Sequence, residues 1–362
     1  MRFYVPVDLR VGADIVHDSA DRIASFGSRF LLLTGASSAK ACGALDDLCR
    51  ALESKNCFFR VYDRIRQNPA VNVCKEAGLL ASQMQADCII GVGGGSALDA
   101  AKAAAVFAAA PSLDEKGLYA YSWPKAVLPV ICVGTTAGTG SEVTPVSVLT
   151  DSESRKRSIR DDRLYPVLSL GDARYLTSLP RSFLYSCAVD AAAHCIESFF
   201  AKTATPISRM FASRGAAVLA QLFGHMDSLS DDEREQLYLA SIYGGYAISV
   251  TGTAFPHAMG YFLTEQYSVA HGTACAVFLP AFLRHAASCI PRDTADFEKR
   301  TGLTVPDWTA LLRRVTPPCG VTLTDTQIEA LRPRFVRNSG ISRTPGVFTD
   351  AEAVETLKEI FQ

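Results

Sequence analysis

The chain has 362 residues, of which 48% are hydrophobic and 20% charged, and its formal net charge is -1. This composition is typical of a well-packed globular protein, and it excludes a disordered or fibrous chain. Because no long run of like charge provides the surface that a nucleic-acid or membrane-surface binder needs, we expect a small-molecule ligand and neither of those partners.

The first half of the chain alternates between strand and helix patterns. Strand-like apolar runs cover 29–35, 56–62, 88–92 and 126–133, and helical spacing covers 38–52, 71–85 and 97–109. This alternation predicts a mostly parallel, Rossmann-like sheet covered by helices.

The second half is predicted to be helical. After Ser178, helical patterns cover 183–201, 208–222, 231–249, 258–266 and 275–287. The length also exceeds what one hydrophobic core usually organises, so a cleft between two domains is a natural place for a site. We therefore predict an α/β dinucleotide-binding domain over residues 1–177 and a helical metal-binding domain over 178–362.

Two glycine-rich loops follow predicted strands. GVGGGSALDAAK at 91–102 precedes a helix, so its backbone N–H groups and the helix start could hold a pyrophosphate. Ser96 stands where the GxGxxG fingerprint requires its last glycine, and Ser96 and Asp99 have the spacing of a helix cap. Taken alone, this loop could equally be a structural turn. The second loop, GTTAGTGSE at 134–142, points at the same crevice and favours nucleotide binding.

The candidate metal ligands lie in the helical half. Asp190 and His194 are four residues apart on a predicted helix and project from one face, while His257 and His271 lie at two other predicted helix starts. Three imidazoles and one carboxylate suit Fe(II) or Zn(II) and lack the thiolates of a closed structural zinc site. An Asp–His pair at this spacing is by itself more often an ordinary helix-surface hydrogen bond.

The other titratable residues receive structural interpretations. His17, His225 and His285 are assigned to surface or packing roles, and Lys102, Lys156 and Lys202 are by default solvated or snorkelling lysines. The eleven cysteines are scattered and never spaced as CxxC, which excludes zinc-ribbon and thioredoxin-like sites and indicates reduced thiols in a cytoplasmic protein. No signal peptide or membrane-spanning stretch is predicted.

Four motifs in chain order resemble the signatures of the iron-containing, or group III, alcohol dehydrogenase family. They are GGGSALDAAK at 93–102, TTAGTGSEVT at 135–144, VDAAAHCIES at 189–198 and HAMGYFLTEQYSVAHGTACAVFLP at 257–280. The resemblance spans nearly the whole chain. It implies a dehydroquinate synthase-like fold, a small alcohol or aldehyde as substrate, and a homo-oligomer, expected as a dimer.

The resemblance also implies roles for individual residues. The divalent metal, Fe(II) or Zn(II), is expected on Asp190, His194, His257 and His271, where it polarises the substrate oxygen during hydride transfer. The expected cofactor contacts are Gly94, Gly95, Ser96 and Asp99 at the diphosphate, Thr135, Thr136 and Thr139 around the nicotinamide, and Asn68 and Lys156.

Two positions bear on cofactor choice and proton transfer. Members of the family that prefer NAD commonly carry an Asp after the first strand, where this chain has Gly35 followed by Ser37, Ser38 and Lys40, so NADP(H) is expected to be preferred over NAD(H). Many members carry a histidine four residues after the third ligand, where this chain has Tyr261. Since a phenol is a poor base at neutral pH, Tyr261 is expected to shape the substrate pocket or to order a water.

Several readings therefore remain open. The favoured one is a metal-dependent NAD(P)-linked alcohol dehydrogenase or aldehyde reductase. The alternatives are a lyase similar to dehydroquinate synthase, a metal-free relative similar to maleylacetate reductase, and a nucleotide-binding protein that has lost catalysis. The complete ligand set argues against all three, although Tyr261 keeps the last one open.

Overall fold

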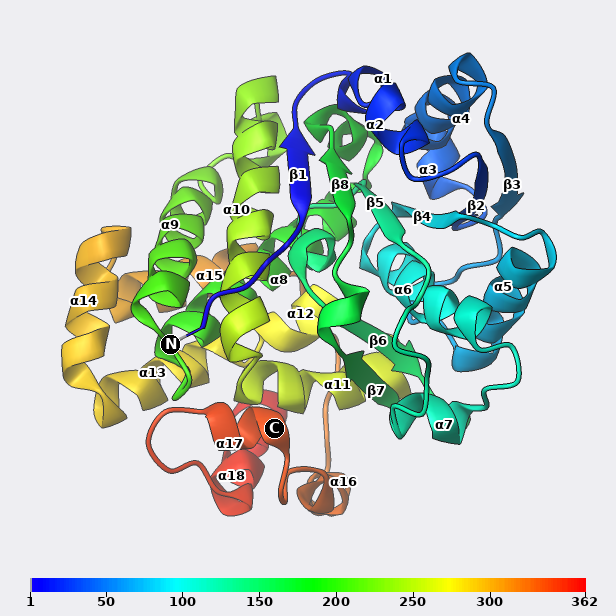
Figure 1. Ribbon diagram of the computed structural model, residues 1–362. Helices are drawn as coiled ribbons and strands as arrows, with labels where there is room; N and C mark the ends of the chain where they lie inside the picture. Colours follow the sequence, from blue (N-terminus) through cyan, green and yellow to red (C-terminus); the bar gives the residue numbers. More distant parts are fainter. Residues whose placement is uncertain (1) are drawn as a thin grey trace. The chain divides into compact units, whose positions relative to one another are not determined.

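The computed structural model describes residues 2–362 and contains two compact units (Figure 1). One unit comprises residues 4–136 and 140–179. The other comprises 137–139 and 180–362 together with the first residues of the chain. The predicted boundary between 177 and 178 stays a proposal, and the sequence pattern did not indicate that 137–139 would group with the helical unit. Within the described part of the chain, none of the helices combines the length and apolar character that a membrane crossing requires.

A six-stranded sheet forms the centre of the first unit. Its order is β1-β8-β5-β4-β2-β3, and every neighbouring pair is parallel. The strands are β1 (Asp8–Val11), β2 (Arg29–Thr34), β3 (Phe58–Tyr62), β4 (Cys88–Gly93), β5 (Val130–Gly134) and β8 (Leu168–Gly171). A separate antiparallel pair consists of β6 (Val146–Thr150) and β7 (Lys156–Arg160). The predicted mostly parallel α/β fold is thus confirmed.

Helices cover both faces of the sheet because successive strand residues point to opposite sides. Along β2, Phe30 and Leu32 join one buried cluster, and Leu31 and Leu33 join the other. The first cluster is completed by α1 (Ile15–Asp18), α2 (Ala20–Ala24), α3 (Ser38–Ala41) and α4 (Ala44–Ser54). The second is completed by α5 (Val71–Gln83), α6 (Gly95–Ala109) and α7 (Glu115–Tyr119).

The strand order places a topological switch point at the carboxyl ends of β2 and β4. These strands are neighbours, but the helices after β2 cover one face of the sheet and the helix after β4 covers the other. The two connections therefore diverge, and open α/β sheets bind ligands where this happens. Both Gly35 and the predicted phosphate loop at Gly94 lie at this edge.

The second unit consists of helices, as predicted. They are α8 (Arg181–Phe200), α9 (Pro206–Leu222), α10 (Asp231–Thr251), α11 (Phe255–Tyr267), α12 (His271–Ala276), α13 (Leu279–Cys289), α14 (Pro291–Thr301), α15 (Val305–Val315), α16 (Asp325–Leu331), α17 (Ser339–Arg343) and α18 (Asp350–Phe361). Its long central helix, α8, is buried along most of its length, because small residues such as those at 191–193 admit neighbours on every side.

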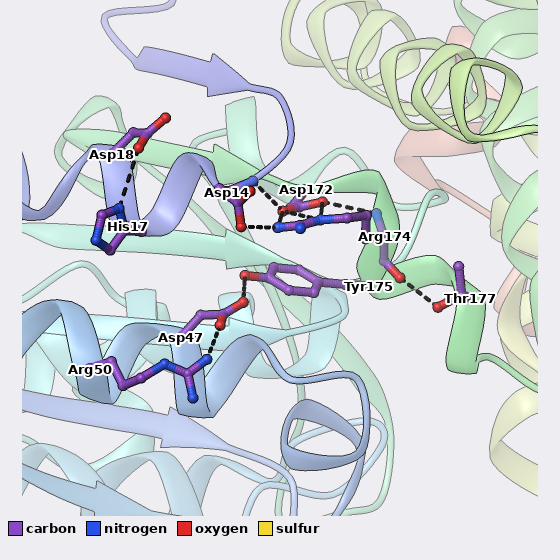
Figure 2. A network of polar contacts seen from close by, with 9 residues as sticks. All are labelled: Asp14, His17, Asp18, Asp47, Arg50, Asp172, Arg174, Tyr175 and Thr177. Carbon is purple, nitrogen blue, oxygen red and sulfur yellow. Dashed lines mark hydrogen bonds and ion pairs between the residues drawn. The ribbon is translucent and has the colours of Figure 1, made fainter.

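A polar network ties β1 to β8 at their carboxyl ends (Figure 2). The Asp172 carboxylate is 1% exposed and accepts from the backbone N–H of Asp14 at 2.9 Å and from Arg174 Nε at 3.0 Å. Arg174 also donates to the Asp14 carboxylate at 2.7 Å. Alongside, the Tyr175 hydroxyl donates to Asp47 on α4 at 2.8 Å. Both oxygens of Asp172 therefore have protein partners.

Two predicted helices are divided in the structure. The helix expected over 38–52 is α3 and α4, because Gly43 between them has a φ of 87°, outside the helical region. The pattern over 275–287 belongs to α12 and α13, since Pro280 lies in the first turn of α13, where its missing N–H is tolerated. The sequence patterns missed the four-residue strands β1 and β8 and the β6–β7 pair.

Two side-chain predictions in the first unit are wrong. The cap proposed for Ser96 and Asp99 does not form, because Gly94 is the N-cap of α6 and no side chain caps it. Instead, the Asp99 carboxylate accepts from Ser141 Oγ at 2.6 Å and from the backbone N–H of Val148 at 2.9 Å. Lys102 is fully buried rather than solvated.

The buried Lys102 is stabilised by oxygen acceptors that the sequence pattern did not reveal. Its Nζ donates to the Ser141 carbonyl at 2.7 Å, to Ser141 Oγ at 2.6 Å and to the Val146 carbonyl at 2.9 Å. Burial lowers the pKa of Lys102, and the nearby Asp99 carboxylate opposes that shift. Lys102 therefore fastens the second glycine-rich loop to α6.

Candidate metal centre and cofactor-binding loops

Three helices of the second unit position the predicted metal ligands. Asp190 and His194 lie one turn apart on α8, so their side chains share a face. His257 lies in the first turn of α11, which Pro256 helps to begin, and His271 is the first residue of α12. The predicted helix starts at His257 and His271 are both present.

A glycine brings α12 close enough to α8 for His271 to reach this face. A Cβ added at Gly272 would lie 1.8 Å from the Ser186 carbonyl oxygen and 2.8 Å from the Asp190 Cβ, so only glycine fits. The adjacent Thr273 N–H donates to Ser186 Oγ at 3.1 Å and fixes the same contact. The glycine after His271 is therefore part of the reason that the side chains converge.

The four predicted ligands converge around one carboxylate oxygen. Asp190 Oδ1 is 3.4 Å from His257 Nε2, 3.9 Å from His194 Nε2 and 4.0 Å from His271 Nε2. The rings of His194 and His257 are stacked with centroids 4.6 Å apart. Asp190, His194 and His257 are buried, and a quarter of the His271 side chain is exposed.

Hydrogen bonds at the far side of two imidazoles fix which nitrogen faces this centre. His257 Nδ1 lies 2.5 Å from Glu197 Oε1, and the other oxygen of this fully buried carboxylate accepts from the Ala254 N–H at 2.6 Å. His194 Nδ1 lies 3.1 Å from the Gly138 carbonyl oxygen, to which it can donate. In the neutral form of both rings, Nε2 then carries the lone pair, an arrangement that orients metal-binding histidines.

Two atoms at the centre are suited to binding a divalent cation. Asp190 Oδ1 and His257 Nε2 are buried and have no hydrogen-bond partner, which is costly for polar atoms in a protein interior. A divalent ion between the carboxylate and the imidazoles would satisfy both. The donor set of oxygen and nitrogen atoms suits Fe(II) or Zn(II).

The protonation preferences of the same groups also favour positive charge at the centre. Burial opposes ionisation of Asp190, but His194, His271 and His257 outweigh it and hold the pKa of Asp190 well below its usual range. Burial likewise opposes a charged His257, yet Cys275, Glu197 and Asp190 raise its pKa well above the ordinary value. Burial lowers the pKa of His194, which keeps this imidazole in the neutral form that binds metals.

Two residues of the centre were not predicted as site residues from the sequence. Glu197 lies three residues after His194 and orients His257, and Cys275 lies four residues after His271 on α12. The donor atoms of Asp190, His257, His271 and Cys275 all lie within 4.8 Å of one another. The only sequence signal for either residue is its helical spacing from a predicted ligand. A Glu or a Cys at such a position in apolar company more often has a purely structural role.

Tyr261 lies one turn after His257 on α11, beside the metal centre. Its ring centroid is 5.9 Å from that of His271. Burial raises the pKa of Tyr261 to about 12, so its hydroxyl is a weaker acid than an exposed phenol.

The two predicted phosphate-binding and nicotinamide-binding loops adjoin each other in the first unit. Thr135 donates its backbone N–H to the Gly93 carbonyl at 3.0 Å. A Cβ added at Gly94 would lie 2.9 Å from the Thr136 methyl group, so the second loop packs directly on the first. Gly95 begins α6, and Ser96 lies in its first turn. Thr139 groups with the second unit, unlike Thr135 and Thr136.

The remaining predicted cofactor residues of the first unit lie around the same loops. Ser96 Oγ accepts from the Asn68 N–H at 3.3 Å, and Asn68 has a left-handed φ of 57°. Lys156 is the first residue of β7. Burial raises the pKa of Asp99, and the positive charges of Lys102 and Lys156 oppose this rise. Gly35 directly follows β2, and the side chains of Ser37 and Ser38 are exposed.

Comparison with known proteins gives consistent matches over both units. The family model described as iron-containing alcohol dehydrogenase matches residues 6–173, and the model of the C-terminal part of that family matches residues 185–306. The chain is 30% identical to the iron-containing alcohol dehydrogenase of Thermotoga maritima, with 99% of each chain covered and a TM-score of 0.92.

Two further relatives are described by their nicotinamide cofactor. The sulfoacetaldehyde reductase of Bifidobacterium kashiwanohense, solved in complex with NAD+, is 25% identical, with 100% of this chain and 98% of that chain covered and a TM-score of 0.90. The NAD-dependent methanol dehydrogenase of Bacillus methanolicus is 25% identical over 77% of this chain and 74% of its own.

Proposed function

The chain belongs to the iron-containing alcohol dehydrogenase family, and from this premise we propose that it transfers a hydride between NAD(P)H and a small aldehyde or primary alcohol. Membership of this family implies a divalent metal, a nicotinamide cofactor and an alcohol or aldehyde substrate. We further propose which residues hold these groups, which cofactor is preferred and which oligomeric state the active protein has.

The main support for this proposal comes from two buried atoms, Asp190 Oδ1 and His257 Nε2. These atoms lie 3.4 Å apart without hydrogen-bond partners, and the Nε2 atoms of His194 and His271 approach the same oxygen. A protein that used this face only for packing would leave polar atoms unpaired at a cost of roughly 1–3 kcal/mol each. We assign Asp190, His194, His257 and His271 as the residues that hold the ion.

The chain's own residues then have distinct tasks. A bound divalent ion supplies Lewis acidity and a nicotinamide supplies or accepts the hydride. Glu197 and the Gly138 carbonyl hold the imidazoles of His257 and His194 so that Nε2 of each faces Asp190. Gly94, Gly95 and Ser96 bind the cofactor diphosphate through the start of α6, which is long enough to contribute its helix dipole.

Tyr261 has a supporting task in this proposal. With a pKa of about 12, its hydroxyl cannot serve as the main base near neutral pH. We propose that it borders the substrate pocket or orders a water, and that Tyr261→Phe keeps the metal and most of the turnover. Loss of turnover at full metal content would contradict this assignment.

We further propose that NADP(H) is preferred. The segment after β2 offers Gly35, the exposed hydroxyls of Ser37 and Ser38, and the exposed Lys40, and residues 34–43 contain no carboxylate to repel a 2′-phosphate. Lys40→Ala should lower kcat/KM for NADPH about tenfold while leaving that for NADH nearly unchanged. Lys125→Ala removes another exposed lysine of the same unit and serves as the control. A clear NADH preference of the wild type would overturn this proposal.

The direct test of the function combines metal analysis with a substrate panel. Protein of measured metal content is assayed on small alcohols and aldehydes with both cofactors. His271→Ala should lose metal and activity together, since this variant removes one nitrogen donor. Full activity without metal, or metal without any hydride transfer on the panel, would refute the proposal. A cytoplasmic location and a homodimer complete the proposal, the latter testable by light scattering.

A further inference from the structure

The connection that follows β3 reaches the end of β2 at Gly35. The two strands pair in parallel, and beyond the last pair the Ile65 N–H donates to the Thr34 carbonyl at 3.1 Å. A Cβ added at Gly35 would lie 3.3 Å from the Ile65 carbonyl oxygen, so the segments after β2 and after β3 are in contact here. The next residue of the second segment is Arg66.

The same segment then reaches the start of α6, where we propose that the cofactor diphosphate binds. Two residues after Arg66, the Asn68 N–H donates to Ser96 Oγ at 3.3 Å, and Ser96 lies in the first turn of α6. Residues 65–68 therefore extend from the carboxyl end of β2 to the beginning of α6. In a dinucleotide cofactor the adenosine ribose is joined directly to the diphosphate, so a residue between these two points lies on the ribose side.

Arg66 differs from the neighbouring Arg64 in having no protein partner. The Arg64 guanidinium donates to Glu76 at 2.8 Å and lies 5.9 Å from the centroid of the Tyr62 ring. Arg66 is exposed, and among the described residues it forms no ion pair, hydrogen bond or ring contact. Its guanidinium is therefore available to bind a phosphate through paired N–H groups.

The charges on the two contacting segments suit a phosphate group. Residues 34–43 contain no carboxylate, and Lys40 adds a second exposed cation. Asp63 is the acidic residue nearest to Arg66 in the sequence, but it lines a hollow with Arg64 to which Arg66 does not contribute. The segments 34–43 and 65–68 thus carry two cations and no carboxylate.

We propose that Arg66 determines cofactor specificity by binding the 2′-phosphate of NADP(H) through charge-assisted hydrogen bonds. NADH lacks this phosphate, so Arg66 affects the choice of cofactor and leaves hydride transfer itself unchanged. Lys40 assists as a point charge. This inference rests on the proposed preference for NADP(H), and it names the side chain that produces that preference.

Cofactor titrations test this role without measuring turnover. The dissociation constants of NADPH and NADH are measured on the full-length protein from the fluorescence of the reduced nicotinamide. We expect Arg66→Gln to raise the Kd of NADPH about tenfold, because a charged hydrogen-bond contact is lost, and to leave the Kd of NADH unchanged. Arg66→Lys should retain part of the preference, since it keeps the charge without the paired N–H groups.

A matched control separates a direct contact from a general effect of charge. Arg60 lies on β3, is exposed, and like Arg66 has no ion pair or hydrogen bond with the described residues. Arg60→Gln removes the same charge from the same edge of the sheet, and it should leave both dissociation constants unchanged. An equal loss of NADPH affinity in Arg60→Gln and Arg66→Gln would overturn the proposed contact.

The remaining outcomes distinguish this inference from the proposed function. Equal weakening of NADPH and NADH in Arg66→Gln, or an unchanged Kd of NADPH, would refute the role of Arg66; in a wild type that prefers NADPH, the proposed cofactor preference would still stand. A wild type that binds NADH as tightly as NADPH would refute that preference and the role of Arg66 together. Hydride transfer on the substrate panel would be unaffected by either result.

Discussion

Two buried carboxylates, Asp172 in the sheet unit and Asp190 in the helical unit, show how differently the same chemical group is used. Asp172 is 1% exposed, and both of its oxygens are paired with the backbone and side chain of Arg174 and the backbone of Asp14. Asp190 is 3% exposed, and its Oδ1 has three imidazole nitrogens around it but no hydrogen bond. Both oxygens of Asp172 therefore have protein partners, whereas Oδ1 of Asp190 needs a partner that the protein does not supply.

This difference distinguishes a structural network from a binding site. A carboxylate paired with arginine and backbone N–H groups is electrostatically complete, so its removal should affect stability alone. A carboxylate surrounded by imidazoles that are oriented from behind is complete only with a cation. Substitutions in the two regions should therefore change different measured quantities, and the following predictions run from the largest expected effect to the smallest.

The largest effect is expected at Gly272, which is not itself a ligand. In Gly272→Ala the added Cβ would clash with the Ser186 carbonyl at 1.8 Å, so α12 must move away from α8 and carry His271 and Cys275 with it. We expect loss of bound metal from a protein that remains helical by circular dichroism. Gly224→Ala, where the nearest atom to the added Cβ is 3.5 Å away, should retain its metal. Full metal content in Gly272→Ala would show that the helix contact does not hold the site.

An intermediate effect is expected from Glu197→Gln. The amide oxygen can still accept from His257 Nδ1, but the NH2 group then faces the Ala254 N–H, and the negative charge that raises the basicity of this imidazole is lost. We expect metal affinity to fall about 10–100-fold, measured by competition with a chelator. The control is Glu233→Gln, which alters another carboxylate–histidine pair, 2.7 Å from His225 on the surface. Unchanged affinity in Glu197→Gln would contradict an orienting role.

The smallest effect on the metal is expected at Asp172. Asp172→Ala removes the partner of Arg174 and leaves the Asp14 N–H without its acceptor, so the free energy of unfolding should fall by about 1–3 kcal/mol in denaturant titrations. This figure allows for solvent screening, because 46% of the Arg174 side chain is exposed. Asp18→Ala, at the exposed pair with His17, should change stability by less than about 0.5 kcal/mol. Metal content should stay at the wild-type level in both variants, and a loss in Asp172→Ala would contradict the comparison.

The same two regions show what could be predicted from the sequence. Apolar runs and helical spacing predicted the parallel sheet, the helical second half and the shared face of Asp190 and His194, because these depend on local periodicity. Lys102 could not be predicted as a buried residue, since its acceptors come from residues 141 and 146, far along the chain. Likewise, the Asp14–Asp172–Arg174 network and the approach of Cys275 to Asp190 depend on contacts between distant segments.

A crystal structure of the protein loaded with zinc, with anomalous scattering recorded at the zinc absorption edge, tests the central claim most directly. We predict one strong anomalous peak within about 2.0–2.2 Å of donor atoms of Asp190, His194, His257 and His271. No peak at this position in active, metal-containing crystals, or a peak bound only by surface side chains, would contradict it.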